Sequence, residues 1–284
     1  MKKIFASILF FCLTNANAAE IQMEDVLFNS KGVNLSGTLV YPEATEIIAA
    51  VIFVHGSGKQ SRNLYLAERF AEGGIAALVY DKRGVGKSEG EFVGVNSANG
   101  HNLKLLAEDA LQAFNVIAAH PKLKNIPLGL TGISQAGWIV PIAAEKSFKA
   151  DFILLWSGAV CKVSEEDIFS KYTADTDSKT VPTYREALQS RKEKYIWGDF
   201  LGEDIDPSMS LAKLKIKGLW IFGGQDGSVP VDLSVERLEI LKNAGGKYEY
   251  VVYPDLGHNN MQDTFDTAVS WIKAFYKHRK TGDE

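Results

Sequence analysis

Residues 132–137 read Gly-Ile-Ser-Gln-Ala-Gly, and this stretch decides the fold. It follows the apolar run 127–131, which is typical of a buried strand, and leads into a helical pattern at 135–145. A serine on a strand–turn–helix junction with the pattern G-x-S-x-G indicates a nucleophile elbow. The turn is sharp, so the residues two before and two after Ser134 must be small. The glycine and the alanine here are small, although the alanine departs from the usual glycine. Taken alone, an ordinary strand–turn–helix junction also fits.

Outside this motif, short apolar runs alternate with amphipathic helical patterns along most of the chain. Strands are expected at 33–41, 49–54, 75–80, 127–131, 152–156, 218–222 and 248–253. Helices are expected at 63–72, 103–119, 135–145, 233–243 and 265–276. The alternation predicts an α/β fold, in which a mostly parallel sheet carries helices on both faces.

One segment interrupts the alternation. Residues 158–212 hold many charges, no clear strand and a helical pattern at 184–197. We expect this segment to form a helical cap inserted into a single domain that spans 19–284.

A serine nucleophile needs a base, and the base needs a group that orients it. His258 lies in the loop after the last expected strand, which places it at the same sheet edge as Ser134. Asp226 follows the strand at 218–222 and is the expected carboxylate. Asp255 competes with it, but its place in a turn beside His258 favours a loop role. The catalytic candidates are therefore Ser134, Asp226 and His258.

The run His55-Gly56-Ser57-Gly58 follows the strand at 49–54. Its glycines let the backbone approach a reacting carbonyl group closely. Acyl transfer needs N–H donors that are already aimed at the developing oxyanion. We expect the backbone amides of Ser57 and Gln135 to form this oxyanion hole, and His55 to organise the loop rather than act as a base.

Taken together, these motifs resemble the α/β-hydrolase superfamily, and within it the esterases and serine peptidase-like hydrolases with an HGSG loop. The matching stretches are 55–58, 81–88 (Asp-Lys-Arg-Gly-Val-Gly-Lys-Ser), the Ser134 elbow, 224–226 with 229–230, and 257–258. The resemblance covers about 33–276 except the cap, and the order Ser–Asp–His is that of the superfamily. It implies acyl-enzyme hydrolysis of a small-molecule ester or a peptide-like substrate, with no metal and no organic cofactor.

In the stretch 81–88, Asp81 and Arg83 are expected to brace the wall near the site. Its end, Gly-Lys-Ser, imitates a phosphate-binding loop, but that loop needs a glycine at position 81. The resemblance favours a carboxylesterase over a serine peptidase or amidase. For the latter, Glu165 and Glu166 are candidate ligands of a free amino group, although a helix-capping role suits them better. A non-catalytic binding protein is a third interpretation.

Composition and the first residues indicate which partners are excluded and where the protein is expected to act. The chain has 284 residues and a formal net charge of −4, so it lacks the basic footprint of a nucleic-acid-binding protein. Residues 1–18 combine two lysines, a short apolar run and the small-x-small pattern Ala-Asn-Ala, which predicts a cleaved signal peptide rather than a membrane anchor. We therefore expect export to the periplasm or beyond, without stable membrane insertion. Cys161 is then the only cysteine, and we expect it to be buried as a small apolar residue. The oligomeric state stays open.

Overall fold

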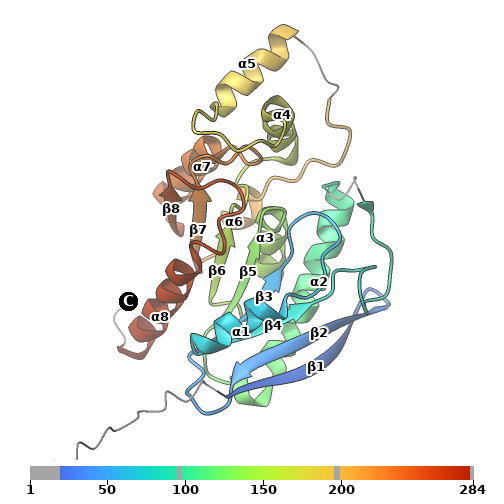
Figure 1. Cartoon of the computed structure of the whole chain (residues 1–284), viewed down its shortest axis with the longest axis vertical. Coiled ribbons are helices and arrows are strands. Elements are labelled where there is room, and N and C mark those ends of the chain that lie inside the picture. The colour runs from blue at the N-terminus through green and yellow to red at the C-terminus, as the bar shows by residue number, and fades with distance from the viewer. Residues whose placement is uncertain (1–19, 95–97, 195–198, 282–284) are drawn as a thin grey trace, which may run out of the picture.

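The fold is an eight-stranded sheet in the order β1-β2-β4-β3-β5-β6-β7-β8 (Figure 1). The computed structural model describes residues 20–94, 98–194 and 199–281, so the expected signal peptide lies outside the described residues. The strands are β1 (Ile21–Ser30), β2 (Val33–Pro42), β3 (Ala49–Val54), β4 (Ile75–Tyr80), β5 (Leu128–Ile133), β6 (Phe152–Trp156), β7 (Lys217–Gly223) and β8 (Lys247–Tyr253). The strands from β4 to β8 in this order are parallel, while β2 pairs antiparallel with both β1 and β4. The predicted α/β class is confirmed.

Helices cover both faces of the sheet. They are α1 (Leu64–Glu72), α2 (Gly100–Ala119), α3 (Ala136–Lys146), α4 (Val163–Thr173), α5 (Tyr184–Lys194), α6 (Ser208–Leu211), α7 (Val231–Asn243) and α8 (Phe265–Thr281), with a short 3₁₀ turn at Pro121–Leu123. Alternate residues of β3 face opposite sides: Ala50, Ile52 and Val54 belong to the core formed with α2 and α3. The residues between them pack with α1 and α8. Burial on both faces explains why this strand is a continuous apolar run.

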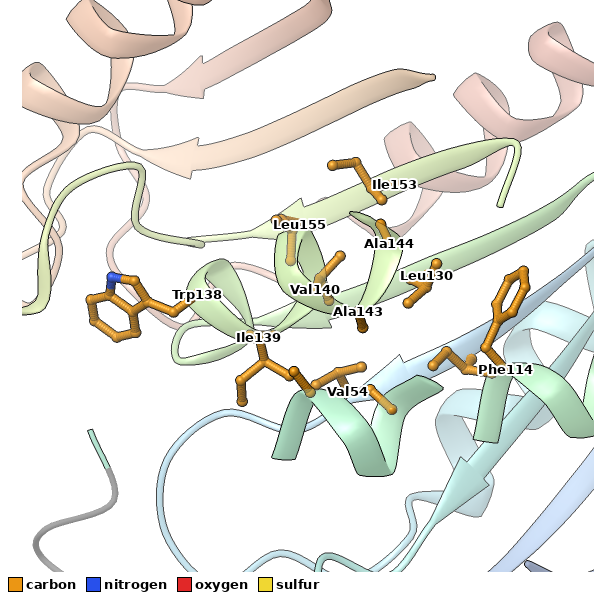
Figure 2. Close-up of a cluster of buried hydrophobic side chains, with 14 of the residues drawn as sticks. Val54, Phe114, Leu130, Trp138, Ile139, Val140, Ala143, Ala144, Ile153 and Leu155 are labelled. Carbon is orange, nitrogen blue, oxygen red and sulfur yellow. The ribbon is translucent and has the colours of Figure 1, made fainter. Parts of the chain in front are cut away.

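The larger core lies between α2, α3 and the central strands (Figure 2). Ile139, Val140 and Ala143 of α3 point toward the strands and α2, and Trp138 points away from them at the start of the helix (Figure 2). The Trp138 indole N–H donates a hydrogen bond to the carbonyl oxygen of Cys161 at 2.8 Å. Cys161 is fully buried, as predicted, and its burial raises the pKa of the thiol.

The hairpin of β1 and β2 extends the sheet at one edge, and β1 is not predicted from the sequence. Alternate residues of β1 are exposed, and polar residues interrupt its apolar pattern. Lys31 and Gly32 connect the two strands with positive φ angles of 50° and 84°, as a tight hairpin turn requires. A buried ion pair between Arg83 and Asp109 of α2 holds this edge, since Arg83 Nη2 also donates to the carbonyl oxygen of Ser30 at 3.0 Å.

Between β6 and β7 the described residues form helices and loops, with no strand. The helical pattern expected at 184–197 is α5, which ends at Lys194; residues 195–198 lie outside the described residues. Helix α4 begins where Glu165 and Glu166 are expected to cap a helix, although its extent is not predicted. Ile168 and Phe169 of α4 pack against Ala187 of α5 in a small core of their own. In Figure 1 both helices stand at the opposite end of the molecule from the C-terminal end of α8. Both helices belong to the cap, residues 158–212.

None of the helices in the described ranges is long and apolar enough to cross a membrane.

Candidate active site

The Ser134 elbow is a strained turn between β5 and α3. Ser134 has a φ angle of +56°, in the left-handed region that L-residues rarely adopt. Its backbone N–H donates to the carbonyl oxygen of Trp156 at 2.9 Å, which fixes the turn against β6. A Cβ atom added at Gly132 would clash with the Cβ atom of Ala136 and lie 2.7 Å from the carbonyl oxygen of Val54. The requirement for a small residue before the serine is therefore a steric one.

The structure brings Ser134, His258 and Asp226 into one hydrogen-bonded chain. The Oγ atom of Ser134 lies 2.9 Å from Nε2 of His258, and Nδ1 of the same ring lies 2.8 Å from Oδ2 of Asp226. Asp226 is buried, and its Oδ1 atom accepts hydrogen bonds from the backbone N–H groups of Ser228 and Val229, both at 2.8 Å. Asp255, the competing acid, is exposed, and the carboxylate that bonds the imidazole is that of Asp226.

The electrostatics of His258 follow from its burial and its acidic neighbours. Burial alone would lower the pKa of the imidazole, because it disfavours the charged form. The hydrogen bond and charge of Asp226, with the charges of Asp177 and Asp175, outweigh burial and raise the pKa of His258 above its usual value. The environment therefore stabilises an imidazolium, the form that a general base becomes after it takes a proton.

The HGSG loop lines a cavity of about 420 Å³ that opens onto Ser134 and His258. The lining also includes Gly56, Ser57 and Gln60. Gly58 has a φ angle of +82°, which a glycine adopts without strain. Gln135, at the N-terminus of α3, is buried directly after the serine. Of the expected oxyanion donors, Gln135 thus lies on the elbow itself and Ser57 on the HGSG loop, which lines the same cavity as Ser134.

His55 has the structural role that the sequence suggests. Its ring contacts Tyr80 edge-on, with 5.0 Å between ring centroids, and the residue is buried. Burial, assisted by the charge of Lys82, lowers the pKa of His55 to about 3. The imidazole is therefore neutral and packs the loop against β4.

The loop 81–88 braces the same edge of the sheet. The carboxylate of Asp81 accepts hydrogen bonds from the Arg62 backbone at 2.8 Å, the Arg62 guanidinium at 2.9 Å, and the Lys87 backbone at 2.9 Å. A Cβ atom at Gly86 would come within 2.6 Å of this carboxylate. The amide of Lys87, which a phosphate-binding loop would offer to its ligand, is occupied by Asp81.

Two residues at the site have no role in the sequence analysis. Asp177 in the cap accepts hydrogen bonds from the backbone N–H groups of His258, at 3.1 and 3.2 Å, and of Gly227 at 3.0 Å. Lys82 places its ammonium group behind the HGSG loop. The sequence could have marked Lys82 as a functional residue, because a lysine directly after a strand that is buried on both faces is unusual. Asp177 lies among many other charged residues of the cap, so nothing in the sequence distinguishes it.

Fold and site together define an α/β-hydrolase, the class whose elbow, HGSG loop and strand-end loops are described above. The profile of the serine aminopeptidases of family S33 matches residues 45–197, and the chain belongs to that family. It is a hydrolase with a mostly parallel sheet, as the sequence predicts.

Solved structures share the fold at low sequence identity. The esterase Pf2001 of Pyrococcus furiosus superimposes with a TM-score of 0.64 and 18% identity over 90% of both chains. An acetyl xylan esterase from Paenibacillus sp. R4 gives 0.63 and 18%, over 96% of this chain and 89% of that one. The acylaminoacyl peptidase of Pyrococcus horikoshii gives 0.62 and 16%, over 92% of this chain and 41% of the peptidase.

Two Mycobacterium tuberculosis proteins, provisionally named as phosphoribosyl transferases, are 30% identical to this chain over 124 residues. The match covers 43% of this chain and 26% of those proteins, so the chain matches about a quarter of their length.

Proposed function

We propose that this protein is an exported serine hydrolase that cleaves a carboxylic ester through an acyl-enzyme. The observation that carries the proposal is the continuous chain from Ser134 Oγ through the His258 imidazole to the Asp226 carboxylate, with 2.9 and 2.8 Å between neighbouring atoms. A nucleophile, a base and an orienting acid in this geometry are what acyl transfer needs.

Acylation follows from the protonation states that the contacts favour. Nδ1–H of His258 donates to Asp226, so Nε2 is free to accept the Ser134 proton. Ser134 Oγ attacks the carbonyl carbon while His258 takes that proton. The oxyanion of the tetrahedral intermediate lies against the N–H groups of Ser57 and Gln135. Each such donor contributes roughly 3–4 kcal/mol of transition-state stabilisation.

Collapse of the intermediate breaks the bond to the leaving group. His258 gives its proton to the leaving oxygen, the alcohol departs, and the acyl group stays on Ser134. Water then donates a proton to His258 and attacks the acyl carbon. His258 returns this proton to Ser134 Oγ, which releases the carboxylic acid and restores the free site.

The contacts of Glu165 in the cap support the ester assignment. Glu165 accepts a hydrogen bond from the backbone N–H of Lys162 at 2.8 Å and pairs with Arg237 at 2.6 Å, so it caps α4 and is engaged in an ion pair. Glu165 therefore does not offer a free carboxylate to a substrate amine. Two of the similar proteins named above are esterases.

A serine peptidase or amidase is the second candidate, and Glu166 is the observation that favours it. Its backbone N–H donates to the carbonyl oxygen of Lys162 at 3.1 Å, but within the described residues its carboxylate makes no hydrogen bond or ion pair. Burial, with the charges of Asp175, Asp167 and Asp226, raises its pKa to about 8. A substrate ammonium group beside it would restore its charge. An acylaminoacyl peptidase is also among the similar structures.

The test of the serine mechanism is the variant Ser134→Ala. We expect wild-type protein to hydrolyse p-nitrophenyl acetate and to react with a fluorophosphonate probe, and Ser134→Ala to lose both while keeping its thermal unfolding profile. Ser57→Ala is the comparison, since it removes another serine hydroxyl that lines the cavity but keeps the backbone amide. Full activity of Ser134→Ala, or labelling at Ser57, would refute the mechanism. A wild-type protein that is folded but neither labelled nor active would favour a binding module.

Ester and amide substrates are separated by a side-by-side assay. We expect short p-nitrophenyl esters to give a kcat/KM at least about 100-fold higher than aminoacyl p-nitroanilides of matched acyl size, roughly 2.7 kcal/mol in transition-state terms. The reverse order, together with a loss of amidase activity in Glu166→Gln, would establish the second candidate instead.

Export is part of the proposal and rests on the pattern of residues 1–18. Expression of the full chain in a bacterium should yield a periplasmic or secreted protein whose first residue is Ala19. Intact Met1 in a membrane fraction would show an anchor.

A further inference from the structure

A buried lysine lies directly behind the proposed oxyanion hole. Lys82 follows β4, the neighbour of β3 in the sheet (Figure 1), and only 3% of its surface is exposed. Its backbone N–H donates to the carbonyl oxygen of Gln60 at 3.1 Å. The Gln60 side chain in turn donates to the carbonyl oxygen of Ser57 at 2.7 Å. The lysine is thus anchored through its backbone to the HGSG loop.

The ammonium group of Lys82 contacts a group next to each of the two expected oxyanion donors. Nζ donates to the carbonyl oxygen of Gly56 at 2.8 Å and to Oε1 of Gln135 at 2.9 Å. The Gly56 carbonyl belongs to the peptide unit whose N–H is that of Ser57. No peptide bond in the described residues is cis, so this N–H points away from the carbonyl. A cation that binds the carbonyl therefore turns the Ser57 N–H to the opposite side.

The charge of Lys82 has no carboxylate partner in the described part of the chain. The carboxylate of Asp81 is turned to Arg62 and the Lys87 backbone. A buried charge without a partner is costly, and such groups concentrate at functional sites. An oxyanion on the other side of the Gly56–Ser57 peptide would be a counter-charge that forms only during the reaction.

We propose that Lys82 is a positioning residue of the oxyanion hole, whose ammonium group fixes the Gly56–Ser57 peptide and the Gln135 side chain and places a positive charge behind the two donors. The inference rests on the proposed function. It predicts an effect on the transition state rather than on substrate binding, because the oxyanion exists only after attack.

The groups around Lys82 determine how its role depends on pH. Burial lowers the pKa of Lys82 to about 8. From the loop after β3, His55 is neutral and Lys59 is exposed; from the loop after β4, Phe92 presents its ring 5.9 Å from Nζ. On its own segment, Asp81 and Arg83 are held in other ion pairs. Lys82 is therefore charged below pH 8 and becomes a neutral, weaker donor above it, so kcat should decline on the alkaline side.

The test compares Lys82→Met with Lys59→Met. Both lysines lie close to the Phe92 ring, at 5.9 and 5.8 Å, but Lys59 is exposed and has no contact with Gly56 or Gln135. On p-nitrophenyl acetate we expect Lys82→Met to lower kcat by about 10- to 100-fold with little change in KM, and Lys59→Met to leave both unchanged. Lys82→Met should also lose the alkaline decline while its acid limb, set by His258, stays in place.

A second measurement tests the oxyanion hole directly. A trifluoromethyl ketone forms a hemiketal on Ser134 whose oxyanion occupies the hole, so its affinity should fall in Lys82→Met by the same factor as kcat/KM. If Lys82→Met does not fold, Gln135→Met, which removes one Nζ acceptor and keeps the backbone amide, should lower kcat by a smaller factor. A folded Lys82→Met with wild-type kcat and alkaline limb, or a Gln135→Met with wild-type kcat, overturns the inference. Wild-type protein without esterase activity or Ser134 labelling would instead refute the proposed function.

Discussion

The carboxylate of Asp177 accepts a bifurcated hydrogen bond from the backbone N–H of His258, with 3.2 Å to Oδ1 and 3.1 Å to Oδ2. Asp177 belongs to the cap, in the loop after α4, and its Oδ1 atom also accepts from the N–H of Gly227, next to Asp226. One cap side chain therefore joins the two loops that carry the base and its orienting acid. The contact makes the cap part of the support of the site.

Asp177→Asn should shift the pH profile of esterase activity. The charge of Asp177 helps to raise the pKa of His258. The base acts when neutral, so activity rises as pH increases through this pKa. Removal of the charge lowers the pKa, and the acid limb of kcat/KM should move to lower pH. The measurement is kcat/KM on a p-nitrophenyl ester across the acid range.

Asp175→Asn is the matched control for this shift. Asp175 also raises the pKa of His258, but it ranks below Asp177 and makes no hydrogen bond to the His258 backbone. We expect a smaller shift in the same direction. An acid limb that stays in place in Asp177→Asn would show that the Asp177 contact is purely structural.

Replacement of Ser134 by glycine should stabilise the fold relative to replacement by alanine. Both variants lack the hydroxyl, but only glycine adopts the observed φ of +56° without strain. The expected difference in the free energy of unfolding is about 1 kcal/mol in favour of glycine, or a Tm about 2–4 °C higher. Differential scanning calorimetry of the two variants measures it.

The control pair for this comparison is Ser147→Gly and Ser147→Ala. Ser147 caps α3 at a φ of −91°, where an L-residue is unstrained, so glycine should bring no gain there. Equal stabilities of the two Ser134 variants would mean that the elbow stores no strain.

Gly132 and Ala136 should be energetically coupled. Only one of the two positions has room for a methyl group, so Gly132→Ala should destabilise the protein by about 1–3 kcal/mol through overpacking. Ala136→Gly in the same chain should recover part of this loss, but not all of it, because the Val54 carbonyl oxygen also lies 2.7 Å from the added atom. Urea unfolding of the two single variants and the double variant gives the coupling energy. Strictly additive effects would argue against the steric account.

The ion pair of Arg83 and Asp109 should be far more sensitive to the loss of one partner than an exposed ion pair. Both side chains are buried, so Asp109→Asn leaves the Arg83 charge without its partner. We expect a loss of about 3–5 kcal/mol in unfolding free energy. The exposed pair of Lys104 and Glu203 is the comparison, and Glu203→Gln should cost less than about 1 kcal/mol. Similar losses in both variants would contradict this ranking.

The sequence predicts the central elements because their burial requires apolar residues at successive positions. A strand buried on both faces, such as β3, must be apolar throughout. The following loop therefore begins directly after the last apolar residue of the strand. The expected limits of β4 and β6 coincide with those in the structure for this reason. The loops at the ends of β5, β7 and β8 then bring Ser134, Asp226 and His258 together.

The remaining features depend on contacts that no local pattern records. Edge strand β1 exposes alternate residues and mixes polar with apolar types, so its periodicity is weak. Helix α4 packs against α5 through very few buried side chains. Lys82 meets Gln135, and Asp177 meets His258, across long stretches of chain. Their roles follow from the folded arrangement and not from spacing.

Cys161 is a natural chemical probe for opening of the junction between β6 and α4. The residue is fully buried just before α4, and its carbonyl oxygen is held by the Trp138 indole. A thiol reagent can reach the sulfur only when this junction separates, so the rate of modification counts opening events without any engineered label. A chain without residues 1–18 has no other cysteine, so every modified molecule reports the same event. Such a chain cannot form an internal disulfide, so its stability owes nothing to an oxidising compartment.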